Sequence, residues 1–143
     1  ELHIIGSGPS LPLVRKLASR VKDVYVHGYL PDRNMLEVLK SSWLFVFPSE
    51  REGLGISALE AMAAGIPVVT TNYLNNATKS LVTNQNGLIV QPSSSHIASA
   101  MQTLYNDEET WQTMSDRARS FAAHYDWSVI TNLMERYLQD IAG

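Results

Sequence analysis

Short apolar runs alternate with longer amphipathic stretches along most of the chain. Leu2–Ile5 is a short apolar run that stops at the glycine-rich segment Gly6–Pro9. Ser10 then precedes an amphipathic stretch whose apolar residues fall on one side of a helical period: Leu13, Val14, Leu17 and Val21. An apolar run, a glycine-rich stop and a helical period in this order predict a strand, a tight turn and a helix.

This strand and helix unit repeats further along the chain. Asp23–His27 alternates between apolar and polar positions, and a second amphipathic stretch carries Met35, Leu36 and Leu39. Trp43–Phe47 is apolar at every position, as expected of a strand covered on both faces. Further strands are predicted at Pro67–Thr71 and Gly87–Val90, and helices at Ile56–Ala64, Ser95–Tyr105, Glu108–Ala123 and Trp127–Ile141.

Strands that alternate with helices at this spacing predict an α/β fold of the Rossmann-like kind, with one doubly wound parallel sheet. Such sheets bind ligands at the carboxyl ends of their strands, where the connecting loops gather. The loops that we expect to carry function are therefore Gly6–Pro9, Gly28–Asp32, Pro48–Gly55 and Asn72–Ala77.

Composition narrows the classes of protein to consider. The chain has 143 residues, 45% of them hydrophobic, which suits one core and is too short for two ordinary domains. It has no cysteine, which excludes disulfides, thiolate metal sites and cysteine nucleophiles. Because this fits a reducing compartment, we expect a cytoplasmic protein. The net charge of −3 argues against sequence-independent binding to nucleic acid, which depends on clustered Lys and Arg.

One basic cluster is present, and it has two interpretations. It is either the solvated face of an amphipathic helix or a surface for anionic lipid or a partner domain. Its members are Arg15, Lys16, Arg20 and Lys22. No apolar run approaches the roughly 20 residues of a membrane span. Glu1–Ile5 opens inside an apolar run without a basic leader, as expected of a chain trimmed from a longer protein.

The segment Pro48–Val69 carries most of the candidate chemistry. Gly53 and Gly55 allow the backbone to come close to a ligand and expose its amides. The predicted helix that begins near Ile56 directs its N–H groups and its positive dipole end into the same space, which suits a diphosphate or a sugar oxygen. Glu60, one turn into that helix, can accept hydrogen bonds from paired hydroxyls such as those of a ribose.

The same segment resembles the group 1 (family 4) retaining glycosyltransferases of GT-B architecture. The family pattern is a strand ending in Pro-Ser, then Glu-Gly-Phe-Gly, a second Glu eight residues after the first, and Glu-Ala-x-Ala-x-Gly-x-Pro-Val. Glu52 and Glu60 occupy its two acidic positions. Taken singly, each glutamate is more simply a solvated side chain or one that favours a helix dipole. Their combination with the glycines, within one segment, carries the resemblance.

The resemblance implies that residues 1–143 are the C-terminal, nucleotide-sugar-binding domain of a glycosyltransferase whose N-terminal acceptor domain is absent. Glu52 would be the catalytic residue that contacts the donor sugar, and Glu60 would hold the ribose. The sugar and diphosphate would meet the backbone of Gly53, Leu54, Gly55, Ile56 and Ser57. The donor would be a UDP-, GDP- or ADP-sugar, with no cofactor and no metal. The partner would be the enzyme's own N-terminal domain, through which peripheral membrane association could arise.

Two weaker matches precede this segment. The strand that ends at Gly6-Ser7-Gly8-Pro9 resembles the family's Gly-x-Gly-Pro turn and makes Gly8 a donor-binding candidate. A plain tight turn is the simpler interpretation of these glycines, because the third glycine of a dinucleotide fingerprint is missing. The loop after the second strand edges the nucleobase in the family, which makes Tyr29 and Leu30 candidates through their backbone groups.

Departures from the family pattern qualify these expectations. Leu54 stands where the family has Phe, and Asn75-Asn76 and Lys79 stand where it often has two glycines and a Glu. We expect the loop that contains Asn75, Asn76 and Lys79 to be less flexible than its counterpart in the family and to carry a different charge, which affects the preference for a donor. The family also places an Arg and a Lys on the diphosphate from a segment upstream of Leu2. We therefore expect the isolated chain to be inactive and to bind a nucleoside diphosphate weakly.

Other chemistry finds less support in the sequence. No D-x-D motif could hold a metal on a diphosphate, and the four histidines lack metal-ligand spacing. His27, at a strand end, is either a ligand contact or a local structural residue. The three tryptophans Trp43, Trp111 and Trp127 fall on apolar faces and are predicted to be core residues. Alternative functions are an epimerase or phosphorylase of the same architecture, or a non-catalytic α/β binding module.

Overall fold

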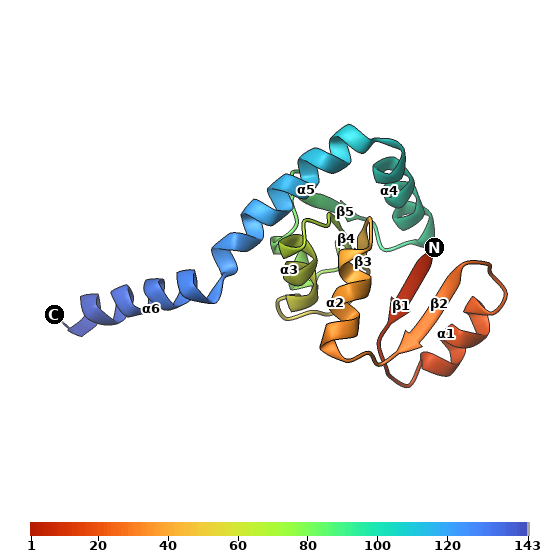
Figure 1. Cartoon of the computed structure of the whole chain (residues 1–143), viewed down its shortest axis with the longest axis horizontal. Helices are drawn as coiled ribbons and strands as arrows, with labels where there is room; N and C mark the ends of the chain where they lie inside the picture. Colours follow the sequence, from red (N-terminus) through yellow and green to blue (C-terminus); the bar gives the residue numbers. More distant parts are fainter. Residues whose placement is uncertain (143) are drawn as a thin grey trace. The chain divides into compact units, whose positions relative to one another are not determined.

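A computed structural model describes residues 1–142 of the chain, which forms two compact units, Glu1–Ser41 and a longer unit that begins at Ser42. Each unit has its own parallel sheet (Figure 1). The α/β class with parallel strands is confirmed, and its strands pair within two sheets where one was predicted. That residues 1–143 act as one domain remains a prediction.

The first unit consists of two strands, each followed by a helix: β1 (Leu2–Ile5), α1 (Leu11–Ala18), β2 (Val24–Gly28) and α2 (Asp32–Lys40). β1 and β2 are parallel, with Leu2 opposite Val24 and Ile4 opposite Val26. α1 packs against β2. The predicted helix is shorter than expected, because it ends at Ala18 and leaves Val21 in the turn before β2.

The second unit holds a three-stranded parallel sheet in the order β3-β4-β5. Its elements are β3 (Phe45–Phe47), α3 (Ile56–Ala63), β4 (Val68–Thr71), η1 (Ala77–Ser80), β5 (Gly87–Val90), α4 (Ser94–Asn106), α5 (Glu108–Ala122), η2 (Ala123–Tyr125) and α6 (Trp127–Ala142). Every strand and helix predicted in this unit is confirmed, with ends that move by at most two residues. Within the unit, α3 packs against α5 and α4 packs against β4 and β5.

β4 is the most buried strand of this sheet because it lies between β3 and β5. All four of its residues are buried, whereas those of β3 are half-buried. One face of the sheet contributes to a core cluster of Val69, Ala100, Leu104 and Met114, against which Leu44, Val46, Leu88, Val90 and Trp111 pack. The predicted helix stop at Gly65 is confirmed, since this residue has φ +77° immediately after α3.

The prediction that all three tryptophans are core residues is wrong for Trp127 and right in part for Trp43 and Trp111. Trp43 and Trp111 stack with ring centroids 4.0 Å apart, and the Trp111 Nε1–H donates to the Trp43 carbonyl at 2.7 Å. Trp111 packs on the core, while Trp43 is 41% exposed. Trp127 is 83% exposed. It opens α6, along which every residue from 127 to 141 is exposed.

Candidate functional site

The loop from β3 to α3 brings the motif residues to the carboxyl end of the second unit's sheet. Gly55 occupies the N-cap position of α3 with φ +90° and ψ +53°, a left-handed conformation that glycine adopts without steric cost. Its carbonyl accepts hydrogen bonds from Ala58 N–H at 2.9 Å and Leu59 N–H at 3.2 Å. No side chain caps the helix. Ala58 N–H is thus paired within the first turn, and the amides of Ile56 and Ser57 are available to an external acceptor.

Two faces of α3 have different roles. Ala58, Ala61 and Met62 are buried and hold the helix in the core. The opposite face carries Ile56 and Glu60, which are four residues apart and therefore neighbours on a helix. Glu60 is half-buried, and its carboxylate makes no hydrogen bond or ion pair with another described residue. A carboxylate placed in this way can accept hydrogen bonds from a ligand that lies over the helix start.

Glu52 is half-buried, and its main chain is held from the neighbouring loop. Its N–H donates to the Asn75 carbonyl at 3.0 Å, and its carbonyl accepts from Ala77 N–H at 3.0 Å. These two bonds form an isolated parallel bridge between Glu52 and Asn76. The Glu52 carboxylate accepts a hydrogen bond from Gly53 N–H at 2.9 Å, so the side chain folds back onto its own loop.

Exposed apolar side chains occur at the start of α3 and in the loop after β4. Leu54 is 45% exposed and Ile56 is 65% exposed, and Leu74 of the loop after β4 is 87% exposed. Gly53 and Ser57 are exposed as well. The five consecutive residues predicted to meet the donor through their backbone thus run from the loop into the first turn of α3, and all of them except the buried Gly55 are exposed.

The loop after β4 is rigidly braced. The Lys79 ammonium donates to the Tyr73 carbonyl at 2.9 Å and to the Leu74 carbonyl at 3.0 Å. Asn76 is fully buried, and its side-chain oxygen accepts from Thr78 N–H at 3.2 Å. Sequence reasoning identified these positions only as departures from the family. An asparagine immediately before a turn, with its side chain in reach of an N–H two residues on, was the available signal for the Asn76 cap.

The remaining candidates lie in the first unit. Gly8 is exposed, with nothing within 4 Å of the position that a side chain would occupy, and its carbonyl accepts from Leu11 N–H at 3.0 Å. Tyr29 is 73% exposed and Leu30 is half-buried, immediately after Gly28 with φ +73°. Their contacts with a donor remain predictions.

His27 has a local partner. Its Nε2 lies 2.9 Å from His3 Nδ1, and the two rings are stacked with centroids 5.2 Å apart. The His3 ring also stacks on Tyr25. A structural part for His27 within the first unit's sheet is therefore confirmed.

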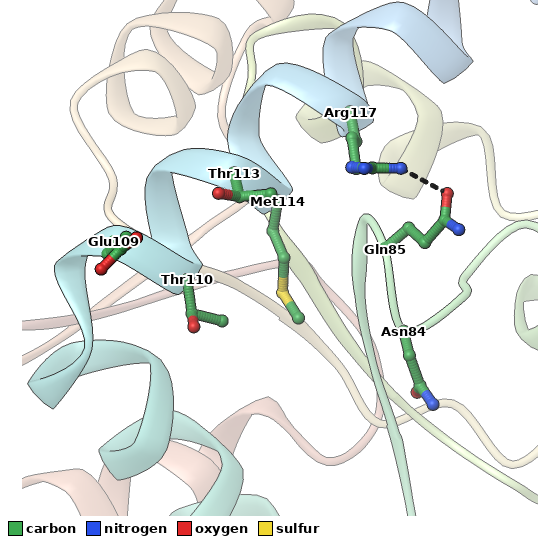
Figure 2. Close-up of a pocket in the computed structure, with 7 residues that line it drawn as sticks. All are labelled: Asn84, Gln85, Glu109, Thr110, Thr113, Met114 and Arg117. Atoms are coloured by element: carbon green, nitrogen blue, oxygen red, sulfur yellow. Dashed lines mark hydrogen bonds between the residues drawn. The ribbon is translucent and has the colours of Figure 1, made fainter.

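A hollow of about 320 Å³ lies at the opposite end of the second unit's sheet, and Figure 2 shows the residues that line it. It is lined by Asn84, Gln85, Glu109, Thr110, Thr113, Met114 and Arg117, and Arg117 donates to the Gln85 side chain at 2.8 Å. Gln85 precedes the first residue of β5, Gly87, so the hollow lies at the amino end of the strand. The motif loop leaves the carboxyl end of β3, so the hollow is separate from the candidate site.

Within residues 1–142, no group of three or more His, Asp or Glu side chains is placed to hold a metal ion. None of the helices described is both long enough and apolar enough to cross a membrane.

Comparison with known proteins gives a consistent result. The family model described as "Glycosyl transferases group 1" matches residues 1–121. The poly(glycerol-phosphate) alpha-glucosyltransferase of Bacillus subtilis is 32% identical over 94% of this chain and 21% of its own length. The chain spans between 21 and 36% of the length of the curated relatives that it matches.

Two solved structures show a similar fold. Sucrose-phosphate synthase from Thermosynechococcus elongatus matches 98% of this chain and 38% of its own, with 22% identity and a TM-score of 0.81. The pneumococcal O-GlcNAc transferase GtfA, solved in complex with UDP and GlcNAc, matches 98% of this chain and 29% of its own. Its identity to this chain is 18% and the TM-score is 0.79.

Proposed function

Because the chain belongs to the group 1 glycosyl transferases, we propose that it is the donor-binding part of a glycosyltransferase that moves a sugar, with retention, from a nucleoside diphosphate sugar to an acceptor. The donor is a UDP-, GDP- or ADP-sugar. The acceptor site belongs to the enzyme's own N-terminal domain, and the enzyme works in the cytoplasm, with membrane association through that domain.

The uncapped start of α3 is the observation that carries this proposal. A left-handed Gly55 turns the loop into the helix, the first-turn amides meet no side chain, and Glu60 lies one turn further on. Amides and a positive dipole end suit the diphosphate or a sugar oxygen, while the carboxylate suits a ribose diol. UDP in the structure of the pneumococcal O-GlcNAc transferase GtfA supports a nucleoside diphosphate as ligand.

The candidate residues have different roles, some in binding the donor and one in the transfer reaction. Glu60 accepts hydrogen bonds from the ribose hydroxyls, and the backbone of Gly53–Ser57 contacts the sugar and diphosphate. Glu52 contacts the donor sugar. Gly8, Tyr29 and Leu30 are proposed for the diphosphate and nucleobase ends of the donor. Catalysis then rests on orienting the donor and stabilising the charge of the departing diphosphate, with no protein nucleophile, cofactor or metal.

Titration calorimetry of this chain with UDP, GDP and ADP, and with a sugar nucleotide of each, tests the proposal. We expect weak binding of one nucleoside diphosphate and no sugar transfer to a broad acceptor mixture. Failure of all six ligands to bind would contradict the donor site. Turnover by this chain alone would contradict its assignment as part of a larger catalytic unit.

A further inference from the structure

We propose that Asn76 is a positioning residue that holds the peptide of Glu52, and through it the carboxylate assigned to the donor sugar. The inference rests on the proposed function of Glu52. It concerns a residue that touches no ligand itself, because the Asn76 side chain is fully buried.

The side-chain amide of Asn76 connects the turn after β4 to β4 itself and, through two threonines of β4, to the end of β3. Its Nδ2–H₂ group donates to Thr70 Oγ1 at 3.0 Å and to the Thr71 carbonyl at 2.9 Å. The same threonines continue the network: the Thr70 hydroxyl donates to the Phe47 carbonyl at 2.9 Å, and the Thr71 hydroxyl donates to the Ser49 carbonyl at 2.9 Å. Asn76 therefore connects the carboxyl ends of β3 and β4 through buried hydrogen bonds.

Glu52 is attached to this network through its main chain. Its N–H and carbonyl are paired with Asn75 and Ala77, the two neighbours of Asn76. The only side-chain hydrogen bond that Glu52 makes among the described residues goes to the adjacent Gly53 N–H. The position of the carboxylate is thus set by its own peptide, and the peptide is set by the loop that Asn76 anchors.

This arrangement explains what an asparagine does in the loop where the family often has glycine. A glycine at position 76 would have no side-chain amide to donate to the Thr70 hydroxyl and the Thr71 carbonyl, and the loop would lose its buried anchor. In this chain the loop is ordered when the protein folds, so the entropy cost of ordering it does not arise on donor binding. Glu52 therefore has its position before a donor binds.

The test uses the full-length protein and the ratio of two dissociation constants, for UDP and for UDP-glucose. GDP with GDP-mannose and ADP with ADP-glucose are the second and third pairs. Asn76→Ala is compared with Asn86→Ala. Asn86 is also a buried asparagine whose amide braces a turn, but it lies at the amino end of β5. Both variants should lower the melting temperature, because each leaves buried polar groups unpaired.

We expect Asn76→Ala to weaken sugar-nucleotide binding about tenfold relative to nucleoside diphosphate binding, the scale of one lost charge-assisted hydrogen bond. Asn86→Ala should leave this ratio unchanged. A folded Asn76→Ala protein with the parent's ratio would overturn the inference, as would an equal loss for both ligands. If the parent binds neither ligand of any of the three pairs, the proposed function itself fails.

A second pair of variants decides the matter if Asn76→Ala does not fold. Thr70→Val keeps the shape of a buried side chain but removes the hydroxyl that links Asn76 to Phe47. Thr70→Ser keeps the hydroxyl. We expect the ratio of the dissociation constant for UDP to that for UDP-glucose to fall in Thr70→Val and to equal the parent's in Thr70→Ser. The inference is overturned if both variants behave alike.

Discussion

The hydroxyl oxygen of Thr78 lies against Gly55 at the point where α3 begins. A methyl group added to Gly55 would overlap this oxygen and contact both the Cβ and the Cγ2 of Thr78 at 3.2 Å. Thr78 is fully buried, and its hydroxyl has no hydrogen-bond partner among the described residues. Gly55 is therefore required both by its φ of +90° and by the space left beside it.

Gly55→Ala should destabilise the chain. A left-handed alanine costs about 1–2 kcal/mol, and the overlap with Thr78 adds about 1–3 kcal/mol of overpacking. Denaturant unfolding measures the difference. Gly53→Ala is the matched control, because Gly53 has open space around it and no left-handed φ. Equal stability of the two variants would show that the turn into α3 tolerates a side chain.

Glu60→Gln in the full-length protein should weaken donor binding. The amide replaces an acceptor oxygen with a donor NH₂ and removes the charge, which weakens two hydrogen bonds to the ribose of roughly 1.5–3 kcal/mol each at most. Because the ribose is held alike in ground and transition states, we expect the loss mainly in the donor KM. The melting temperature should stay near that of the parent. Unchanged nucleotide affinity would make Glu60 a structural residue.

Glu52→Gln should affect the reaction more than binding. The bonding of the donor sugar changes during transfer, so a group that contacts it acts mainly in the transition state. We expect kcat to fall by a larger factor than the donor KM rises, because the glutamine side chain stays in place and keeps a contact with the sugar that a displaced Glu52 would lose. The main-chain bonds of Glu52 to Asn75 and Ala77 do not depend on its side chain, so the variant should fold normally. A change confined to KM would speak against a part in the reaction step.

Asp107 should make the stability of α5 depend on pH. Its carboxylate accepts from the Thr110 N–H at 2.9 Å and from the Thr110 hydroxyl at 2.7 Å, and these bonds lower its pKa below the ordinary value of 3.8. The charged form therefore stabilises the helix start above pH 3.8, and this contribution disappears as the pH falls through the lowered pKa.

Thermal melts of Asp107→Ala and the parent across this range should show the effect. The variant should melt at a lower temperature at neutral pH, and the gap should close in acid. Asp107→Asn keeps an oxygen acceptor without a charge, so its melting temperature should not follow this titration. A gap that is independent of pH would mean that the carboxylate charge does not matter.

Donor binding by the full-length protein should be insensitive to chelators. The proposed function assigns no metal ion to the donor site and balances the charge on the diphosphate with helix dipoles and cations. Activity assays with and without EDTA provide the check. Activity that EDTA abolishes and Mg²⁺ or Mn²⁺ restores would count directly against a metal-independent site.

Most secondary structure was predictable because its signals are local. Gly87–Val90 was predicted as a strand with the bounds that β5 has. The ends of helices were harder to predict, as at α1, which stops before Val21. The error for Trp127 has a different origin: an apolar face in the sequence shows that a residue can be buried, and only packing partners decide whether it is.

Periodicity, glycine stops and motif spacing are properties of neighbouring residues, so the family, the order of strands and helices, and the pair of glutamates eight residues apart could all be predicted from the sequence. The contacts that hold the glutamates in place could not. The parallel register of β3 and β4 brings Glu52 beside Asn76, 24 residues further along the chain, and buries the Asn76 amide among threonine hydroxyls. Buried hydrogen bonds of this kind depend on which strands pair and in which register, and no local pattern records that pairing.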